Sequence, residues 1–405
     1  MVRPKRRTRA DLVAAAAIAA VVALVAVAVW WNSDARATVS RPAVAPVPSL
    51  EPAETVPDTL TQRWSAPSPT TTRPLVVAGA VVTGDGQTVQ GRDPATGDTV
   101  WTYARDRQLC GVTWVYDYAV AVYPDSRGCG QVSTVDAETG TRGPARSSYA
   151  DDQVELSTDG TTVLSAGPTR LEMWRSDMVR MLSYGALDAP IKPDVPATPL
   201  CRLVSAAASS SAVSVLEACG NQADLRLTLL RPSDEEDVPE VQYVQQNGVP
   251  EGSGARVVAV AGTTTAVYVS TPAPRVDIID DTGTTIASTV VPSPATPEAT
   301  ASRVGDLITW WTGDTLMVFS GDDLQYKYSV AAADGNAPIG PATIMAGRLL
   351  VPVTGGYDVF DPQTGAGERH IPLQRPAMDV AGPVVPAVAG SMLLEQRGGE
   401  LVALS

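Results

Sequence analysis

Four cysteines are the residues of this sequence whose type and spacing most clearly suggest covalent chemistry. They are Cys110, Cys129, Cys201 and Cys219, which form two pairs separated by 19 and 18 residues. An even number of cysteines in an exported domain suggests disulfide bonds. Zinc is the alternative, but neither pair has the short C-x₂₋₄-C spacing and the chain has only one histidine. We therefore expect disulfides and no bound metal.

Residues suited to nucleophilic or acid–base catalysis are scarce. His370, the single histidine, falls in a predicted outer strand without a neighbouring nucleophile motif. Beyond the N-terminal segment the lysines are Lys192, in a Pro-rich loop, and Lys327, between two tyrosines. Acidic residues are plentiful, yet no spacing singles out a catalytic pair, and the acidic run 233–237 lacks the ligand spacing of a calcium loop. We predict that the protein is not an enzyme and needs no cofactor.

Charge divides the chain into a basic N-terminus and an acidic body. The formal net charge is −14, whereas residues 1–31 carry an excess of four positive charges, so the remaining residues sum to −18. An acidic body repels phosphate backbones and anionic lipid headgroups. We therefore exclude nucleic acid as a partner.

The N-terminus predicts a membrane anchor. After a basic tail (1–11), residues 12–31 form an uncharged apolar run of 20 residues, which as a helix would cross the hydrocarbon core. The basic tail should stay in the cytoplasm, which places the body outside the membrane. A cleaved secretory signal is the alternative, because Ala35-Arg36-Ala37 offers a cleavage site, but the apolar run exceeds the usual length of such signals. We assign residues 32–58, which are rich in proline, to an extended linker that holds the body off the membrane.

Self-similar segments predict the fold of the body. Residues 74–105 contain four short strand patterns separated by turns at Gly79, Asp85-Gly86 and Asp93–Gly97, and residues 342–374 repeat that order. Further copies lie at 111–143, 154–186, 202–244, 255–291 and 298–331. A final copy, 384–405, supplies only three strands, and residues 59–66 offer the fourth. This pattern predicts an all-β, eight-bladed β-propeller over residues 59–405, closed by a blade shared between both ends of the domain. Seven blades and a β-sandwich are the alternatives, the first because the turns of two copies are degenerate.

One turn motif carries a family resemblance. The segment RDPATGDTVW (92–101) resembles the A-x-D-x-x-T-G-x-x-x-W repeat of pyrroloquinoline-quinone-like propellers, and 135–140 and 360–365 match its turn without the Trp. The whole chain is similar in plan to uncharacterised alanine/valine-rich membrane proteins of mycobacteria and related actinobacteria, a resemblance that supplies no function. In each turn the Asp should accept backbone hydrogen bonds and the Gly should adopt a positive φ, while the Trp packs between blades. These structural residues are Asp93, Gly97, Trp101, Asp136, Gly140, Asp361 and Gly365.

The repeat also selects one pairing of the cysteines. In the second copy, Cys110 precedes the first strand and Cys129 lies in the turn between the second and third strands. Cys201 and Cys219 stand in nearly the same relation in the fourth copy. Antiparallel strands bring these positions to the same end of a blade. We therefore predict the disulfides Cys110–Cys129 and Cys201–Cys219, each stabilising the fold by about 3 kcal/mol through loop-closure entropy.

These features favour a non-enzymatic scaffold or protein-interaction module in the cell envelope, tethered by residues 12–31. Its partners would be other envelope proteins or cell-wall polymer. The alternative is a ligand-binding sensor that holds a cell-wall sugar or peptide fragment. A quinoprotein dehydrogenase, which the resemblance invites, is disfavoured because the chain lacks adjacent cysteines and has few Trp-bearing repeats.

Overall fold

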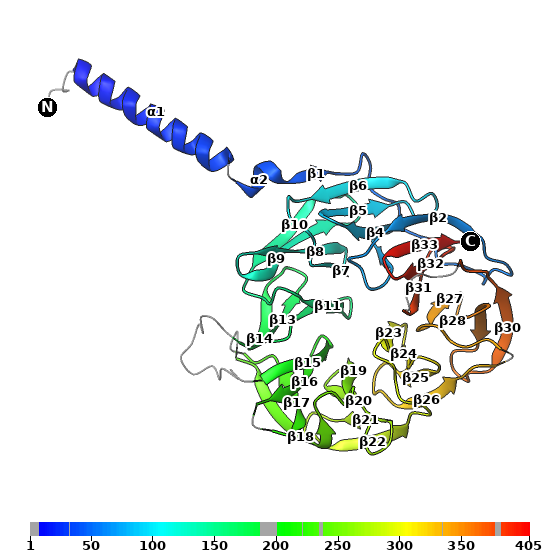
Figure 1. Cartoon of the computed structure of the whole chain (residues 1–405). Coiled ribbons are helices and arrows are strands. Elements are labelled where there is room, and N and C mark those ends of the chain that lie inside the picture. Colours follow the sequence, from blue (N-terminus) through cyan, green and yellow to red (C-terminus); the bar gives the residue numbers. More distant parts are fainter. Residues whose placement is uncertain are drawn as a thin grey trace.

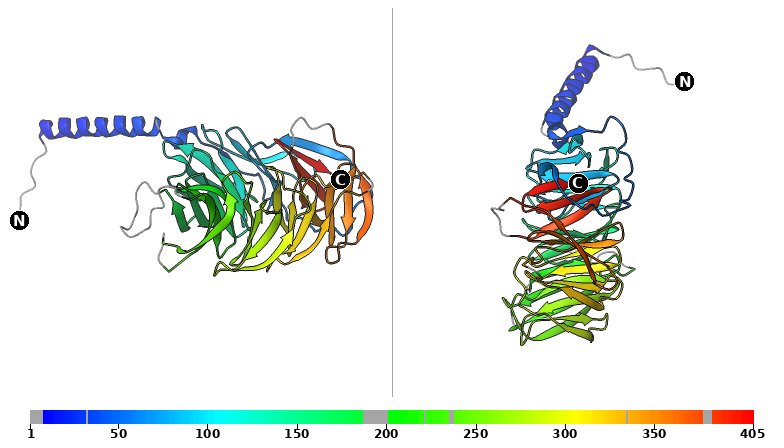
Figure 2. Two further views of the ribbon diagram at one scale, coloured as in Figure 1. Left: turned by 60° about the horizontal axis from the view of Figure 1, so that its bottom comes forward. Right: turned by 90° about the vertical axis from the view of Figure 1, so that its right-hand side faces the viewer.

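The strands of the body form eight antiparallel sheets arranged in a ring, seven of four strands and one of five (Figure 1). The computed structural model describes residues 8–31, 33–186, 201–220, 222–234, 238–333, 335–376 and 382–405. The two further views show the ring as a flat disc (Figure 2). The predicted eight-bladed β-propeller is thereby confirmed, and the seven-bladed alternative is wrong.

Each blade is a meander whose first strand lies nearest the axis. Blade 1 contains β3 (Leu75–Val77), β4 (Ala80–Asp85), β5 (Thr88–Arg92) and β6 (Thr99–Ala104), and blade 2 contains β7 (Gly111–Val115), β8 (Tyr118–Asp125), β9 (Gly128–Asp136) and β10 (Arg142–Ser147). Blade 3 contains β11 (Glu155–Thr158), β12 (Thr162–Ala166), β13 (Arg170–Arg175) and β14 (Arg180–Gly185), and blade 4 contains β15 (Cys201–Ala208), β16 (Val213–Cys219), β17 (Asp224–Arg231) and β18 (Glu240–Pro250).

The second half of the ring follows the same plan. Blade 5 contains β19 (Arg256–Ala261), β20 (Thr264–Val269), β21 (Arg275–Ile279) and β22 (Thr285–Val290), and blade 6 contains β23 (Thr300–Val304), β24 (Leu307–Trp311), β25 (Leu316–Ser320) and β26 (Tyr326–Val330). Blade 7 contains β27 (Thr343–Met345), β28 (Arg348–Val353), β29 (Gly356–Phe360) and β30 (Gly367–Pro372), and blade 8 contains β31 (Val384–Ala389), β32 (Met392–Arg397) and β33 (Glu400–Leu404). The middle strands of the blades are almost wholly buried and form the core between neighbouring blades.

Blade 8 is completed by a strand from the other end of the domain. β2 (Gln62–Pro67) pairs antiparallel with β33, with Ser65 opposite Val402. Beyond the strands, Thr61 and Ser405 exchange backbone hydrogen bonds of 2.9 and 3.0 Å. The two ends of the propeller therefore meet in one sheet, which leaves β33 without an open edge.

The N-terminal helix α1 (Arg9–Trp31) has a mean hydropathy of 3.0 in its most apolar window, and none of it is buried. Thr8 and Asp11 cap its first turn, because the backbone N–H of each donates to the side chain of the other. It is long and apolar enough to cross a membrane. A four-residue helix, α2 (Asp34–Ala37), follows it directly.

The linker after α2 differs from the expected free spacer. β1 (Val39–Arg41) pairs with β6, so it becomes a fifth, outermost strand of blade 1. The next residues stay on the disc: the backbone N–H groups of Ala43 and Val47 donate to Thr139 and Glu138 of blade 2, each at 2.9 Å. The chain then passes Gly79, whose φ of +87° and lack of a side chain admit the carbonyl of Pro48.

The linker ends on blade 7. Ala53 and Val56 pack against its core cluster, and Arg369 binds both Asp58, at 2.6 Å, and the carbonyl of Val56. Residues 39–58 therefore lie along the disc rather than forming a free spacer. Proline keeps this segment extended, but an extended chain still presents backbone N–H groups and alternate side chains to a neighbouring surface. Only residues 32–38 separate α1 from the disc, which limits the gap to about 25 Å even when fully stretched.

The linker contacts define two faces of the disc. The linker passes Gly79 in the β3–β4 turn of blade 1, Glu138 and Thr139 in the β9–β10 turn of blade 2, Gly390 in the β31–β32 turn of blade 8 and Ala346 in the β27–β28 turn of blade 7. We call this end of the blades the linker face. The opposite end carries the turns between strands two and three and the connections between blades. Both cysteine pairs lie there, so we call it the disulfide face.

Two valines of the linker provide a matched test of its packing. Val47 is 7% exposed, whereas Val44 is fully exposed. Val47→Asp should lower the free energy of unfolding by about 2 to 3 kcal/mol, because it buries a carboxylate without a partner. Val44→Asp should change it by less than about 0.5 kcal/mol. Urea unfolding of the full-length protein in detergent measures both values, and equal effects of the two substitutions would show that the linker is a free spacer.

Candidate functional site

Both predicted disulfides are present on the disulfide face. Cys110 is bonded to Cys129 in blade 2, and Cys201 is bonded to Cys219 in blade 4. The second pair joins the first residue of β15 to the residue directly opposite it on β16. Each crosslink thus fixes one end of a blade.

Asp151 links the first disulfide to blade 3. The backbone N–H of Cys129 donates to the carbonyl of Asp151 at 2.9 Å. The carboxylate of Asp151 accepts the backbone N–H groups of Thr169 and Arg170, both at 3.0 Å, and the Thr169 hydroxyl at 2.6 Å. A side chain at Gly167 would collide with this carboxylate, so the close approach requires glycine. The turn between β12 and β13 is therefore held against blade 2.

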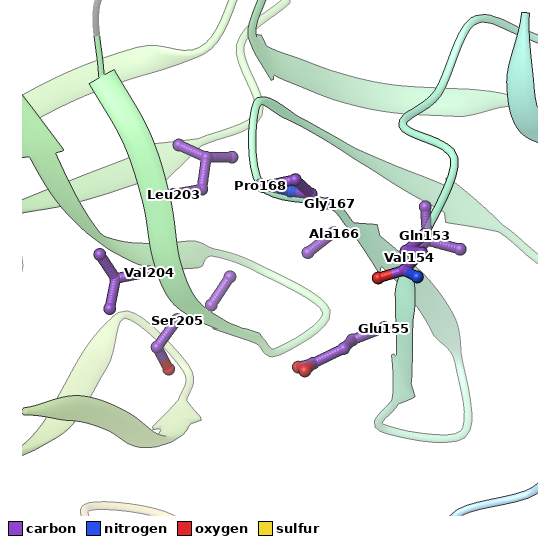
Figure 3. A pocket seen from close by; sticks show the side chains of 10 residues that line it. Gln153, Val154, Glu155, Ala166, Gly167, Pro168, Leu203, Val204 and Ser205 are labelled. Atoms are coloured by element: carbon purple, nitrogen blue, oxygen red, sulfur yellow. The ribbon is translucent and has the colours of Figure 1, made fainter. Parts of the chain in front are cut away.

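A groove opens between that turn and the first strand of blade 4. It has a volume of about 400 Å³ and is lined by Gln153, Val154, Glu155, Ala166, Gly167, Pro168, Leu203, Val204, Ser205 and Ala206. Figure 3 shows residues of β15 along one side and residues 153–155 on the other. The N–H of Leu203 donates to the carbonyl of Pro168 at 2.8 Å, which joins the two walls at one point. Each wall is thus fixed at the end of a blade by a disulfide, one directly and one through Asp151.

The groove has a mixed polar and apolar lining with one acidic group. Six of its lining residues carry aliphatic side chains or proline, and Glu155, which is exposed, is the one charged residue among those that line it. The polar groups are Gln153, Ser205 and the backbone. Such a surface suits an apolar side chain of a partner and offers no group suited to nucleophilic attack.

Three buried glutamates tie neighbouring blades together, and their side chains are 0 to 4% exposed. Glu217 of blade 4 accepts the hydroxyl of Tyr184 of blade 3 at 3.0 Å and pairs with Arg226 at 2.9 Å. Glu395 of blade 8 accepts the hydroxyl of Tyr357 of blade 7 at 2.6 Å.

The third glutamate and the arginines of Glu395 complete this pattern. Glu172 of blade 3 binds Arg146 of blade 2 at 3.1 Å, and also pairs with Arg170 and Arg180. Glu395 pairs with Arg375 at 2.7 Å and with Arg397 at 2.5 Å. Each carboxylate is thus bound by a side chain of the preceding blade, a tyrosine hydroxyl or an arginine, while arginine compensates its charge.

The contacts around Glu395 lower the pKa of one group and raise the pKa of another. Burial alone would raise the pKa of Glu395, but the hydrogen bonds and charge of Arg375, with the charge of Arg397, more than offset it and hold that pKa below its usual range. Burial and the adjacent Glu395 carboxylate raise the pKa of the Tyr357 hydroxyl well above its usual value. The cluster is therefore ionised at Glu395 and neutral at Tyr357 at physiological pH.

The turn residues singled out by the repeat lie on the linker face. Asp93 accepts the backbone N–H groups of Ala95 and Thr96 at 2.8 and 3.0 Å, and Gly97 has a φ of +79°. Asp136 and Asp361 accept N–H groups in the same way, while Gly140 and Gly365 have φ values of +72° and +71°. Trp101, 1% exposed, donates from Nε1 to the carbonyl of Ala137 in the next blade at 2.8 Å. These residues shape the blades and lie at the opposite end from the groove.

The residues weighed for catalysis do not come together. His370 lies on β30, where Nδ1 is 2.7 Å from the Asp358 carboxylate, and Lys327 lies on β26, where Nζ contacts Gln363. Lys192 and residues 235–237 of the acidic run lie outside the described residues. The described groups are therefore dispersed over blades 6 and 7 at the rim.

One group of the described residues has ligand atoms close enough for a metal. Single atoms of Cys201, Glu217 and Cys219 lie within 4.8 Å of one another. In the oxidised protein the two sulfurs are bonded to each other, and Nη2 of Arg226 lies 3.5 Å from the Cys201 sulfur. A guanidinium in this position opposes a second cation, so the arrangement acts as a structural brace.

The groove and the buried glutamates were missed in the sequence. A readable signal for the glutamates exists, because the strings VLE (215–217), LLE (393–395) and RLE (170–172) place an acid within an otherwise apolar strand. A buried acid of this kind needs a partner. The groove has no such signal, because its walls come from two blades and its depth depends on small residues.

Comparisons with known proteins agree on the fold. No family model and no curated protein matches the sequence. Among solved structures, BamB from Moraxella catarrhalis is similar, with 13% identity and a TM-score of 0.50, over 86% of this chain and 100% of that one. The C-terminal WD40 domain of Sif2 is similar with 10% identity and a TM-score of 0.55, over 87% of this chain and 99% of that one. Such identities show a shared β-propeller fold, so function must be argued from the site.

The Glu395 cluster predicts a large and pH-dependent effect on stability. Glu395→Gln should lower the free energy of unfolding at pH 7 by about 3 to 5 kcal/mol, because two arginines lose their buried counterion. The control is Glu368→Gln, which removes a partly exposed pair with Arg348 and should cost less than about 1 kcal/mol.

The sign of the pH dependence follows from the lowered pKa of Glu395. Its contribution is complete above the unfolded-state pKa of about 4.3 and is lost as the pH falls through the folded-state value. The difference in stability between wild type and Glu395→Gln should therefore shrink between pH 5 and pH 3, as measured by urea unfolding. A difference that stays constant over this interval would contradict the ionised cluster.

Proposed function

We propose that this protein is a non-enzymatic scaffold of the bacterial cell envelope, held at the membrane by α1 and binding a protein partner on its disulfide face. The groove between blades 3 and 4 is the proposed contact site. The observation that carries this proposal is that both disulfides, which lie in different blades, brace the walls of one groove, which offers aliphatic side chains beside polar groups. Rigid walls reduce the entropy lost on binding.

The position of the linker supports the choice of face. Residues 39–58 occupy the linker face over blades 1, 2, 7 and 8, and β1 occupies the outer edge of blade 1. The groove lies on the other face and in other blades, so binding there does not displace the tether. The short connection from α1 would keep blade 1 near the membrane.

Compartment and orientation follow from the same features. We propose that α1 is a retained single-pass anchor with a cytoplasmic N-terminus, because the basic residues precede it. Disulfides form in oxidising compartments, which supports a propeller outside the membrane. We further propose a pyrroloquinoline-quinone-like origin for the repeats, supported by three Asp-x-x-Thr-Gly turns with the same hydrogen bonds.

The partner is proposed to be another envelope protein that inserts apolar side chains. A cell-wall sugar is the weaker alternative, because none of the residues lining the groove is aromatic and Gln153 is its one side-chain amide. A quinoprotein dehydrogenase is weaker still, since the cysteines are paired 18 and 19 residues apart rather than adjacent.

Site-specific photo-crosslinking in cells tests the proposed contact site. A photoreactive phenylalanine analogue at the exposed position Glu155 should give a discrete adduct with one partner protein. The control position is Val290 on β22, which is 73% exposed and lies outside the groove. Replacing Cys201 and Cys219 by serine should reduce the adduct at position 155, because the wall formed by β15 is then less rigid. No adduct at 155, or the same adduct at 155 and 290, would refute the groove as the contact site.

A further inference from the structure

A second cavity lies where the inner strands of blades 3 to 6 approach the axis of the ring. It has a volume of about 310 Å³, and its walls include Ser157 of β11, Ser209 after β15 and Ser302 of β23. Three charged side chains also line it, namely Arg73, Asp159 and Arg303. The cavity therefore combines hydroxyl groups with an excess of one positive charge.

Arg73 enters this cavity from the opposite side of the ring. It belongs to the connection between β2 and β3, and its Nη2 donates to the carbonyl of Ala301 in blade 6 at 3.1 Å. No carboxylate of the described residues lies within salt-bridge distance of it, and this is its one hydrogen bond among them. The other N–H groups of its guanidinium are thus available to a ligand.

The connection that carries Arg73 is held in place. Thr71 donates to the side chain of Gln396 at 3.1 Å, and the Gln396 amide donates to the carbonyl of Ser68 at 3.0 Å. Gln396 is 2% exposed and belongs to β32. Because blade 8 fixes this loop, the direction of Arg73 is set before any ligand arrives.

The other charged groups of the cavity differ from Arg73 in bonding or in exposure. Asp159 accepts the backbone N–H groups of Thr161 and Thr162 at 2.9 and 2.8 Å, whereas Arg303 also donates to a single backbone carbonyl, that of Gly321 at 2.6 Å, but is exposed. Arg73 differs also from the arginines of the inter-blade clusters, each of which faces a glutamate. Burial without a compensating acid lowers the pKa of Arg73. A bound anion would stabilise the charged guanidinium and so oppose this lowering of the pKa.

We propose that the central channel binds a small oxyanion, the carboxylate or phosphoryl group of a small molecule, through the guanidinium of Arg73. The planar fork of arginine matches two oxygens of such a group, and Ser157, which is exposed, can donate a further hydrogen bond. The strongly acidic body disfavours large polyanions, which limits the ligand to one that fits within the channel. This site is separate from the groove on the disulfide face.

Calorimetric titration of the full-length protein in detergent tests this proposal. Sodium phosphate and sodium acetate serve as probes, each titrated at constant ionic strength against a sodium chloride blank. The wild type should bind at least one of the two, and the preferred probe distinguishes a phosphoryl from a carboxylate ligand. Arg73→Gln should weaken that binding about tenfold or more, the loss expected for one charge-assisted contact.

Two further variants separate binding from folding. Arg63→Gln removes an exposed arginine of β2 and should leave affinity unchanged, while Arg73→Lys keeps the charge and should retain part of the affinity. Thermal unfolding of Arg73→Gln in chloride shows whether the ring is intact. The proposal would be overturned if the wild type bound neither probe, or if wild type and Arg73→Gln bound with equal affinity. Arg73 would then have only a structural role, through its hydrogen bond to Ala301.

Discussion

The pairing of β2 with β33 is the constraint on which the rest of the structure depends. It joins residues 62–67 to residues 400–404, so the first and last strands of the propeller belong to one sheet. Trp64 extends this seam to blade 1, because its Nε1 donates to the carbonyl of Pro94 at 2.9 Å and its ring lies over Gly97. Without β2, the edge of β33 would be open and the packing of blade 8 against blade 1 would lose its outer strand.

The closure also dictates the path of the tether. The chain must arrive at β2 on the rim of blade 8, while α1 joins the disc at the rim of blade 1. The linker therefore crosses the seam, and it contacts blades 2, 1, 8 and 7 on one face. This leaves the disulfide face and the rim of blades 3 to 6 for partners. The proposed tether and the proposed contact site therefore lie on different parts of the ring.

Much of this fold is readable from the sequence because its determinants are local. The turns at Asp93–Gly97 and Asp361–Gly365 recur with fixed spacing, so the blades, the split terminal blade and the cysteine pairing could all be predicted. The packing of the linker could not be predicted, because proline content indicates an extended backbone but does not indicate which surface that backbone contacts. Val44 and Val47 are the same residue type in the same segment, yet one is exposed and the other buried.

The candidate sites escaped prediction for a related reason. Glu155 and Val204, which line the groove, are 49 positions apart, and Arg73 contacts Ala301 across 228 positions. Such proximity arises only when the ring closes. The buried glutamates are an intermediate case. An acid inside an apolar strand indicates that a partner is present, but which blade supplies that partner depends on the packing.

Ring closure can be measured most directly with two truncations of the chain. Removing residues 1–58 deletes the anchor and linker but keeps β2, whereas removing residues 1–67 deletes β2 as well. The account predicts that the first truncation still unfolds in a single cooperative transition in urea, with amides 401–404 protected from hydrogen exchange. The second should lose this protection and unfold at a much lower urea concentration. Equal unfolding midpoints and equal protection of β33 in both truncations would contradict the closure of the ring by β2.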